Sequence, residues 1–207
     1  MKKIAALAAS MTLALCLTGC GNEAQPENEA ASVDELGAAI KELSEAEGQG
    51  DEPTEPFDIA MKNISESNLP NVDPSSEEGK QQIRDYLSSD AMQYRDSIFE
   101  FMNMSLDAVA NMDTCKAQDA EEYGPILCEK VINQKNIPHS CSGVHIANVT
   151  MAKNAEEAII AYSQAAKTDD QEEANRLIAE GNAAVKKYTA ATESFQAEVD
   201  KLNSYIQ

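Results

Sequence analysis

Residues 171–207 read QEEANRLIAEGNAAVKKYTAATESFQAEVDKLNSYIQ, and apolar or small side chains recur in them every seven positions. One line of the repeat is Ile178, Val185, Thr192, Val199 and Ile206, and the other is Ala174, Gly181, Tyr188, Phe195 and Leu202. Heptads of this kind define a narrow apolar seam along one long helix, as in a coiled coil. Such a seam has to be buried against other helices, so these residues predict a helical bundle.

The residues just before this helix predict a second long helix that pairs with it. Segment 144–167 places Val149, Ala152, Ala155, Ile159, Tyr162 and Ala166 on one helical face. Only the turn at 168–170 separates the two helices, and so short a connection makes them antiparallel neighbours. Small residues near the turn should allow a close approach, with Ala174 and Gly181 facing Ala161 and Ala165 or their neighbours.

A third long helix is predicted from residue 75 to about residue 113. Ser75 and Glu78 form a capping box after Pro74, which is typical of a helix start. An apolar stripe follows at helical spacing, made of Leu87, Ala91, Tyr94, Ile98, Phe101, Ser105, Ala108 and Met112 and widened by Met102 and Val109. This pattern indicates an amphipathic helix with one buried face.

Segment 119–136 is interrupted by Gly124 and Pro125, which should break a helix. A short helix carrying Ile126, Leu127, Val131 and Ile132 is expected to follow and to end before Pro138. No segment shows a convincing two-residue strand pattern. The sequence therefore predicts an all-α fold over residues 75–207, an antiparallel helical bundle of three long helices and one short helix.

Residues 20–74 have the composition of a disordered acidic linker. They contain five of the seven Pro and few apolar side chains, too few to offset the entropy lost on ordering. One short helix is possible at 33–47, where Ser32 and Glu35 form a capping box and Val33, Leu36, Ile40 and Leu43 recur at helical spacing. Such a helix either docks on a partner or on the bundle, or is only marginally formed alone.

The N-terminus carries an export pattern. Lys2 and Lys3 precede an apolar run over 4–17 that is too short to span a membrane, and Leu17-Thr18-Gly19-Cys20 closes it. The pattern resembles the lipobox signal peptide of bacterial lipoproteins. The resemblance implies that residues 1–19 are removed and that Cys20 is acylated on its thiol and its new amino group, with palmitate-type chains. It also implies a protein anchored by lipid to the cell membrane and facing outside the cytoplasm.

Charge and cysteine content narrow the environment further. The chain has 16 Lys and Arg against 36 Asp and Glu, a formal net charge of −20. This balance argues against a nucleic-acid partner and keeps the body away from anionic lipid headgroups.

With Cys16 removed and Cys20 acylated, three thiols remain, and they allow at most one internal disulfide. Cys128–Cys141 is the favoured pair, because the loop 137–143 could fold Cys141 back. Cys115–Cys128 is the alternative, and it requires a turn at Gly124-Pro125, since a continuous helix would hold the two thiols too far apart.

A metal site is the weaker hypothesis for the loop around Cys141. The only two His, His139 and His145, flank this thiol, and imidazole with thiolate suits zinc or copper. The spacing matches no established ligand pattern, so a polar loop is the preferred interpretation. The sequence thus predicts no metal and no cofactor.

The sequence predicts a protein that is not an enzyme. It has no Gly-rich phosphate loop, no Gly-x-Ser-x-Gly and no His-Glu-x-x-His. Two non-enzymatic functions are open: a surface interaction or scaffold module with an envelope or cell-surface protein partner, and a ligand-binding or sensory module for a small molecule, peptide or metal. The scarcity of aromatic residues, with four Phe, six Tyr and no Trp, favours the first.

Overall fold

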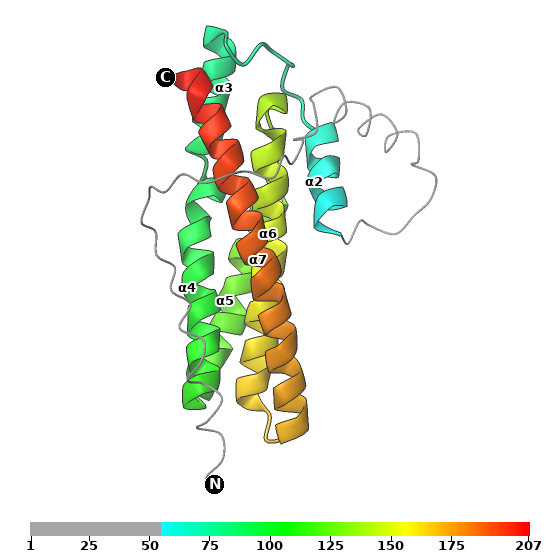
Figure 1. Cartoon of the computed structure of the whole chain (residues 1–207), viewed down its shortest axis with the longest axis vertical. Coiled ribbons are helices and arrows are strands. Elements are labelled where there is room, and N and C mark those ends of the chain that lie inside the picture. Colours follow the sequence, from blue (N-terminus) through cyan, green and yellow to red (C-terminus); the bar gives the residue numbers. More distant parts are fainter. Residues whose placement is uncertain (1–54) are drawn as a thin grey trace, which may run out of the picture. The chain divides into compact units, whose positions relative to one another are not determined.

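A computed structural model describes residues 55–207, and in this range the chain forms helices and loops without a strand. The helices are α2 (Pro56–Ser65), α3 (Glu77–Leu87), α4 (Asp90–Asn111), α5 (Thr114–Ile132), α6 (Ser142–Lys167) and α7 (Gln171–Ile206), with a 3₁₀ turn η3 (His139–Cys141) before α6 (Figure 1). The prediction of an all-α antiparallel bundle is confirmed. The predicted signal peptide over 1–19, the predicted lipidation residue Cys20 and the possible helix at 33–47 lie outside the described residues.

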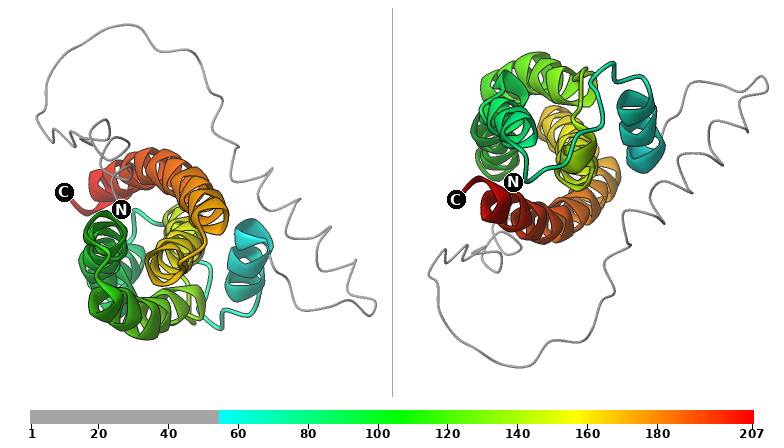
Figure 2. Two further views of the ribbon diagram at one scale, coloured as in Figure 1. Left: turned by 90° about the horizontal axis from the view of Figure 1, so that it is seen from below. Right: turned by 90° about the horizontal axis from the view of Figure 1, so that it is seen from above.

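Helix α6 is the central helix of the bundle. It packs against α7, α5, α4 and α2, and most of its residues are buried. Figure 2 shows α6 among α4, α5 and α7, with α2 on its remaining side. Many of its buried positions are Ala, which lets several neighbours approach the same helix closely. None of the helices described is both long and apolar enough to cross a bilayer.

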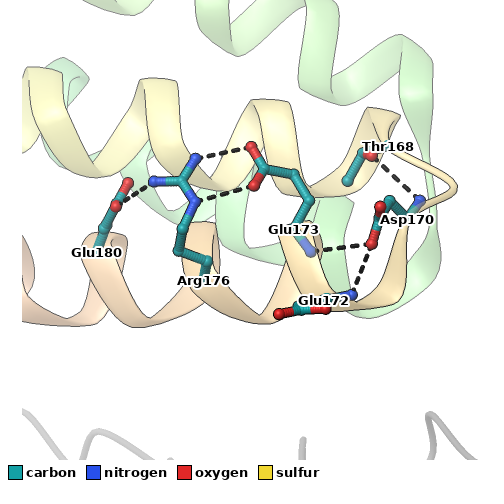
Figure 3. A network of polar contacts seen from close by, with 6 residues as sticks. All are labelled: Thr168, Asp170, Glu172, Glu173, Arg176 and Glu180. Carbon is teal, nitrogen blue, oxygen red and sulfur yellow. Dashed lines mark hydrogen bonds and ion pairs between the residues drawn. The ribbon is translucent and has the colours of Figure 1, made fainter.

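The predicted α6–α7 hairpin is present, and local hydrogen bonds fix its turn. The Asp170 carboxylate accepts hydrogen bonds from the backbone N–H groups of Glu172 and Glu173, at 2.9 and 3.1 Å. The Thr168 hydroxyl accepts a further bond from the Asp170 N–H at 3.2 Å (Figure 3). These contacts satisfy N–H groups that a helix start leaves without partners, so the sequence itself sets the beginning of α7.

One line of the predicted α7 seam is right from Gly181 onward, although Ala174 is only half-buried, and the other line is displaced by one residue. Gly181, Tyr188, Phe195 and Leu202 are buried as expected. The second buried line is Leu177, Ala184 and Ala191, whereas Ile178, Val185 and Thr192 are half-buried on the flank. Both buried lines keep the seven-residue spacing, so the period of the seam was predicted correctly and only the register of the second line was wrong.

The close approach of α6 and α7 is made at Gly181, which faces Tyr162, the neighbour of Ala161, as the prediction allowed. A Cβ at Gly181 would lie 2.6 Å from the Tyr162 ring. This ring is fully buried, and its hydroxyl donates a 2.8 Å hydrogen bond to Asn182. The missing side chain at position 181 thus makes room for a large aromatic group.

Helices α4 and α7 contact each other through aromatic and arginine side chains. The Phe99 and Tyr188 rings stack with centroids 6.4 Å apart, and the Arg95 guanidinium lies 4.7 Å from the Phe195 ring centroid. Both contacts add favourable energy to the burial of the aromatic rings. They connect α4 and α7 through side chains.

The helix predicted over 75–113 is two helices. Its start is capped by Ser76 rather than Ser75, since the Ser76 hydroxyl accepts from the Gly79 N–H at 3.0 Å. The first of these helices, α3, ends before Ser88, whose hydroxyl donates a 2.9 Å hydrogen bond to the Arg84 carbonyl. Serine competes with the backbone for hydrogen bonds in this way, so it favours a helix end.

The predicted stripe of this helix ends one residue too late. Met102 and Ala108 are buried as expected, but Met112 is 65% exposed. Met112 has left the helix and adopts a left-handed conformation with φ of 54°. This residue terminates α4 instead of contributing to the core.

Gly124 and Pro125 do not break the helix. The prediction that a separate short helix begins after them is therefore wrong. Helix α5 is continuous through Pro125. A Cβ at Gly124 would lie 2.9 Å from Ile159 and 3.3 Å from Phe101, so the glycine allows α5 to pack closely on α6 and α4. Tertiary packing here outweighs the poor helix propensity of the Gly-Pro pair.

The expected linker over 20–74 is also wrong for its last part, because residues 56–65 form α2. Pro56 is at the first helical position, where its missing N–H costs nothing, and Asp58 follows in the first turn. Ala60, Met61 and Ile64 are buried. The folded part therefore begins well before residue 75.

Candidate functional site

The structure carries Cys115, Cys128 and Cys141 as free thiols. Cys115 and Cys128 lie in one continuous helix, roughly 20 Å apart along its axis, which is beyond the reach of a disulfide. The Cys128 thiol lies within the electrostatic range of Glu156 and Lys153. Those two residues follow Cys141 by at least twelve positions in α6, about 18 Å of helix. Neither predicted disulfide is formed.

The two buried thiols, Cys128 and Cys141, have low reactivity. Burial raises the pKa of Cys128 and of Cys141 to about 12. A thiol with so high a pKa is protonated at neutral pH, and only the thiolate is a strong nucleophile or metal ligand. These cysteines therefore act in the structure as small apolar side chains.

The candidate metal residues His139, Cys141 and His145 do not form a ligand set. His139 is partly exposed, whereas Cys141 and His145 are fully buried. Within residues 55–207, no group of three or more His, Cys, Asp or Glu side chains is arranged to hold a metal. Both ring nitrogens of His145 contact protein groups instead, and these groups make a different kind of site.

A buried polar cluster is built around His145 from three helices. The His145 Nδ1 lies 3.2 Å from the Tyr86 hydroxyl of α3, and its Nε2 lies 3.4 Å from the Asn63 Nδ2 of α2. The same Asn63 nitrogen donates a 2.5 Å hydrogen bond to the Ile132 carbonyl at the end of α5. Asn63, Tyr86 and His145 are all buried, so the contacts to His145 take the place of hydrogen bonds to water.

The geometry of the cluster fixes the tautomer of His145. An amide nitrogen can only donate, so the Asn63 Nδ2 requires Nε2 of His145 to be the acceptor. The proton of the neutral ring is then on Nδ1 and points to the Tyr86 oxygen. Burial lowers the pKa of His145 to about 4, which keeps the ring neutral at pH 7.

A groove of about 440 Å³ lies between α6 and α7. It is lined by Glu157, Ile160, Ala161, Gln164, Leu177, Glu180, Ala183, Ala184 and Lys187. No residue of α6 from 142 to 156 is exposed, and Glu157 is the first exposed residue of the helix. The groove therefore occupies the half of α6 that its neighbours cover least.

A second hollow of about 230 Å³ borders the polar cluster. Its lining includes Leu69, Asp85, Tyr86, Gln134 and Lys135. The Gln134 side chain donates to the Ser89 hydroxyl at 3.1 Å, while its Oε1 is buried without a hydrogen-bond partner among residues 55–207. Buried acceptors in folded proteins usually have a hydrogen-bond partner, so this oxygen is a candidate contact for a donor group.

The chain matches no protein-family model, no curated protein and no solved structure. Its function therefore has to be inferred from the groove, the second hollow and the polar cluster.

Asn63, Tyr86 and the groove were not predicted from the sequence. A signal for α2 was present in Pro56 and in the apolar spacing of Ala60, Met61 and Ile64. Recognising that helix would have drawn attention to Asn63, a polar residue on its apolar side. No sequence signal could have joined it to His145, which is 82 residues away.

Proposed function

We propose that this chain is a lipid-anchored extracytoplasmic lipoprotein whose helical bundle is a non-enzymatic interaction or scaffold module. Its partner is an envelope or cell-surface protein that inserts one amphipathic helix into the α6–α7 groove. The observation that carries the proposal is this groove, where Ile160 is half-buried and small side chains from both helices form the walls.

The shape of the groove suits a helix better than a compact ligand. The small side chains of Ala161, Ala183 and Ala184 leave a shallow channel along the two helices. An amphipathic helix fills such a channel with apolar anchors spaced by three or four residues. A volume of about 440 Å³ holds a few large side chains of the partner.

The charges around the groove indicate the chemistry of the partner. Its rim carries Glu157, Glu180 and Lys187, in a chain whose net charge is −20. A negative surface attracts a basic partner and speeds its association, and a rim with both signs favours one orientation. The partner helix is therefore expected to flank its apolar anchors with Lys or Arg.

Site-specific photocrosslinking in the native membrane tests the groove directly. A photoreactive residue at Gln164, which is exposed in the groove, should capture one defined protein, identified by mass spectrometry. The same residue at Gln118, exposed on α5, is the control and should not capture that protein.

Two matched substitutions on α7 make this test specific. Ala183 lines the groove, while Ala190 is equally exposed outside it. Ala183→Glu should reduce the Gln164 crosslink at least tenfold, because it places a charge against the apolar anchors, and Ala190→Glu should leave it intact. Equal crosslinking in both variants would count decisively against the groove.

A ligand-binding or sensory module is the second candidate, supported by the unpaired Gln134 Oε1 beside the second hollow. A small molecule or peptide with an N–H group would supply the missing donor. An NMR screen of short peptides should then shift the Gln134 side-chain signals, and Gln134→Met should abolish binding. A screen in which no peptide shifts these signals would dismiss this candidate.

A further inference from the structure

His145 is the residue at which two peripheral helices are joined to the central helix. It is 0% exposed, and its two ring nitrogens reach α2 through Asn63 and α3 through Tyr86. Both partners are neutral, and Asn63 also holds the carbonyl of Ile132. The arrangement satisfies a neutral ring completely.

A protonated ring would not fit the same arrangement. Both nitrogens of an imidazolium are donors, so Nε2–H would face the donor N–H of Asn63. The amide cannot resolve this by rotating, because its oxygen would then face the Ile132 carbonyl, which the amide nitrogen now contacts at 2.5 Å. The Tyr86 contact, in contrast, survives because Nδ1 is already the donor. Protonation therefore weakens the contact between His145 and Asn63, which is the contact that holds α2.

We propose that His145 is an acid-sensitive latch that holds α2 on α6 when its ring is neutral and releases α2 when the ring is protonated. The released helix would uncover the first half of α6. This inference does not depend on the groove or on the partner proposed above.

The other titratable groups near His145 do not account for such a response. Tyr86 from α3 and Cys141 at the start of α6 are neutral throughout the acid range, since burial raises the pKa of both. Glu198 of α7 lies over Gly143, and no acidic or basic group on α2, α3, α5 or α7 affects the pKa of His145. The ring therefore has no carboxylate to stabilise its charge.

The ion pair between Glu66 and Lys135, at 2.9 Å, also ties α2 to the chain after α5. Lys135 lowers the pKa of Glu66 below its ordinary value of 4.5, so this pair is intact at pH 5. His145 responds at a higher pH than the Glu66–Lys135 ion pair does. The folded pKa of His145 is below the unfolded value, so its stabilising effect is present above pH 6.5 and is lost as the pH falls towards 4.

Hydrogen exchange of the full lipidated chain in detergent micelles tests the latch at pH 7 and pH 5. After correction for intrinsic exchange, the protection of the α2 amides should fall roughly 20-fold at pH 5 and should stay below that of the α7 amides at both pH values, because α2 exchanges by local release and not by global unfolding. The variant His145→Gln cannot be protonated and should lose this dependence. His139→Gln, which removes the only other His, should behave as the unaltered chain does.

Equal protection of α2 at both pH values in the unaltered chain would overturn the proposal, and so would an undiminished loss in His145→Gln. A second measurement needs no variant and covers the case in which His145→Gln does not fold. The ¹⁵N shifts of the ring should show the Nδ1–H tautomer at pH 7 and should titrate together with the α2 signals. The opposite tautomer, or α2 signals unchanged after the ring has titrated, would equally exclude the latch.

Discussion

At the scale of single residues, the packing around α6 is tight enough that one methyl group matters. Gly181 meets the buried Tyr162 ring, which is also held by its hydrogen bond to Asn182. Gly143 meets only the flexible side chain of Glu198. The two glycines thus differ in how easily their surroundings can yield.

The first prediction follows from this difference. Gly181→Ala should lower the free energy of unfolding by about 1–2 kcal/mol, because overpacking exceeds the gain in helix propensity. Gly143→Ala should change it by less than about 0.5 kcal/mol, since the Glu198 side chain can move aside. Urea denaturation of both variants measures the difference, and equal effects would show that the Tyr162 ring moves freely.

The second prediction concerns two fully buried serines. The Ser163 hydroxyl has no hydrogen-bond partner in the part of the chain that the structure describes, whereas that of Ser105 donates to the Met102 carbonyl at 2.8 Å. Ser163→Ala should raise the free energy of unfolding by about 1 kcal/mol, because it removes an unsatisfied polar group. The melting temperature should rise accordingly. Ser105→Ala should lower it or leave it unchanged. A lower melting temperature for Ser163→Ala would mean that a water molecule or another group satisfies this hydroxyl.

At the scale of the helices, the start of α7 depends on its cap more than on its exposed ion pairs. Arg176 bonds to the Glu173 carboxylate at 2.7 Å and also pairs with Glu180, but all three side chains are about half exposed. Exposed pairs of this kind contribute little. Asp170, which satisfies two N–H groups, is the more important residue.

The third prediction is that Asp170→Ala costs about 1 kcal/mol of stability, while Arg176→Ala costs less than about 0.5 kcal/mol. Chemical denaturation at low and high salt measures both. Asp170→Asn should retain most of the stability, since asparagine caps helices equally well. A larger loss in Arg176→Ala than in Asp170→Ala would reverse this ranking.

The helices also show what the sequence could and could not predict. The bounds of α6 and α7 followed from local signals, namely the heptad pattern and the turn before Asp170. The continuity of α5 did not, because the Gly-Pro pair opposes a helix locally and only contacts with Ile159 and Phe101 reverse the outcome. The polar cluster was beyond prediction as well, since Tyr86 and His145 are 59 residues apart and meet only in the packed bundle.

At the scale of the whole molecule, the proposed anchor sets where the bundle works. The fourth prediction is that Cys20→Ser moves the protein from the membrane fraction to the soluble fraction, because it removes the acylated thiol. Cys115→Ser, which changes an exposed thiol on α5, should leave it in the membrane fraction. Fractionation and immunoblotting measure this, and a Cys20→Ser chain still in the membrane would refute lipid anchoring at this residue.

The central position of α6 has a consequence for the order of folding. Helices α2, α4 and α5 all precede α6 in the chain, yet each of them packs on it. On the proposed export route the N-terminus leaves the cytoplasm first, so these helices emerge before their common partner. The hairpin of α6 and α7 joins neighbouring segments and should form fastest, because closing a short loop costs little entropy. The chain would then stay unfolded during transport. Folding would begin with the hairpin of α6 and α7 near the C-terminus, and the earlier helices would pack onto it afterwards.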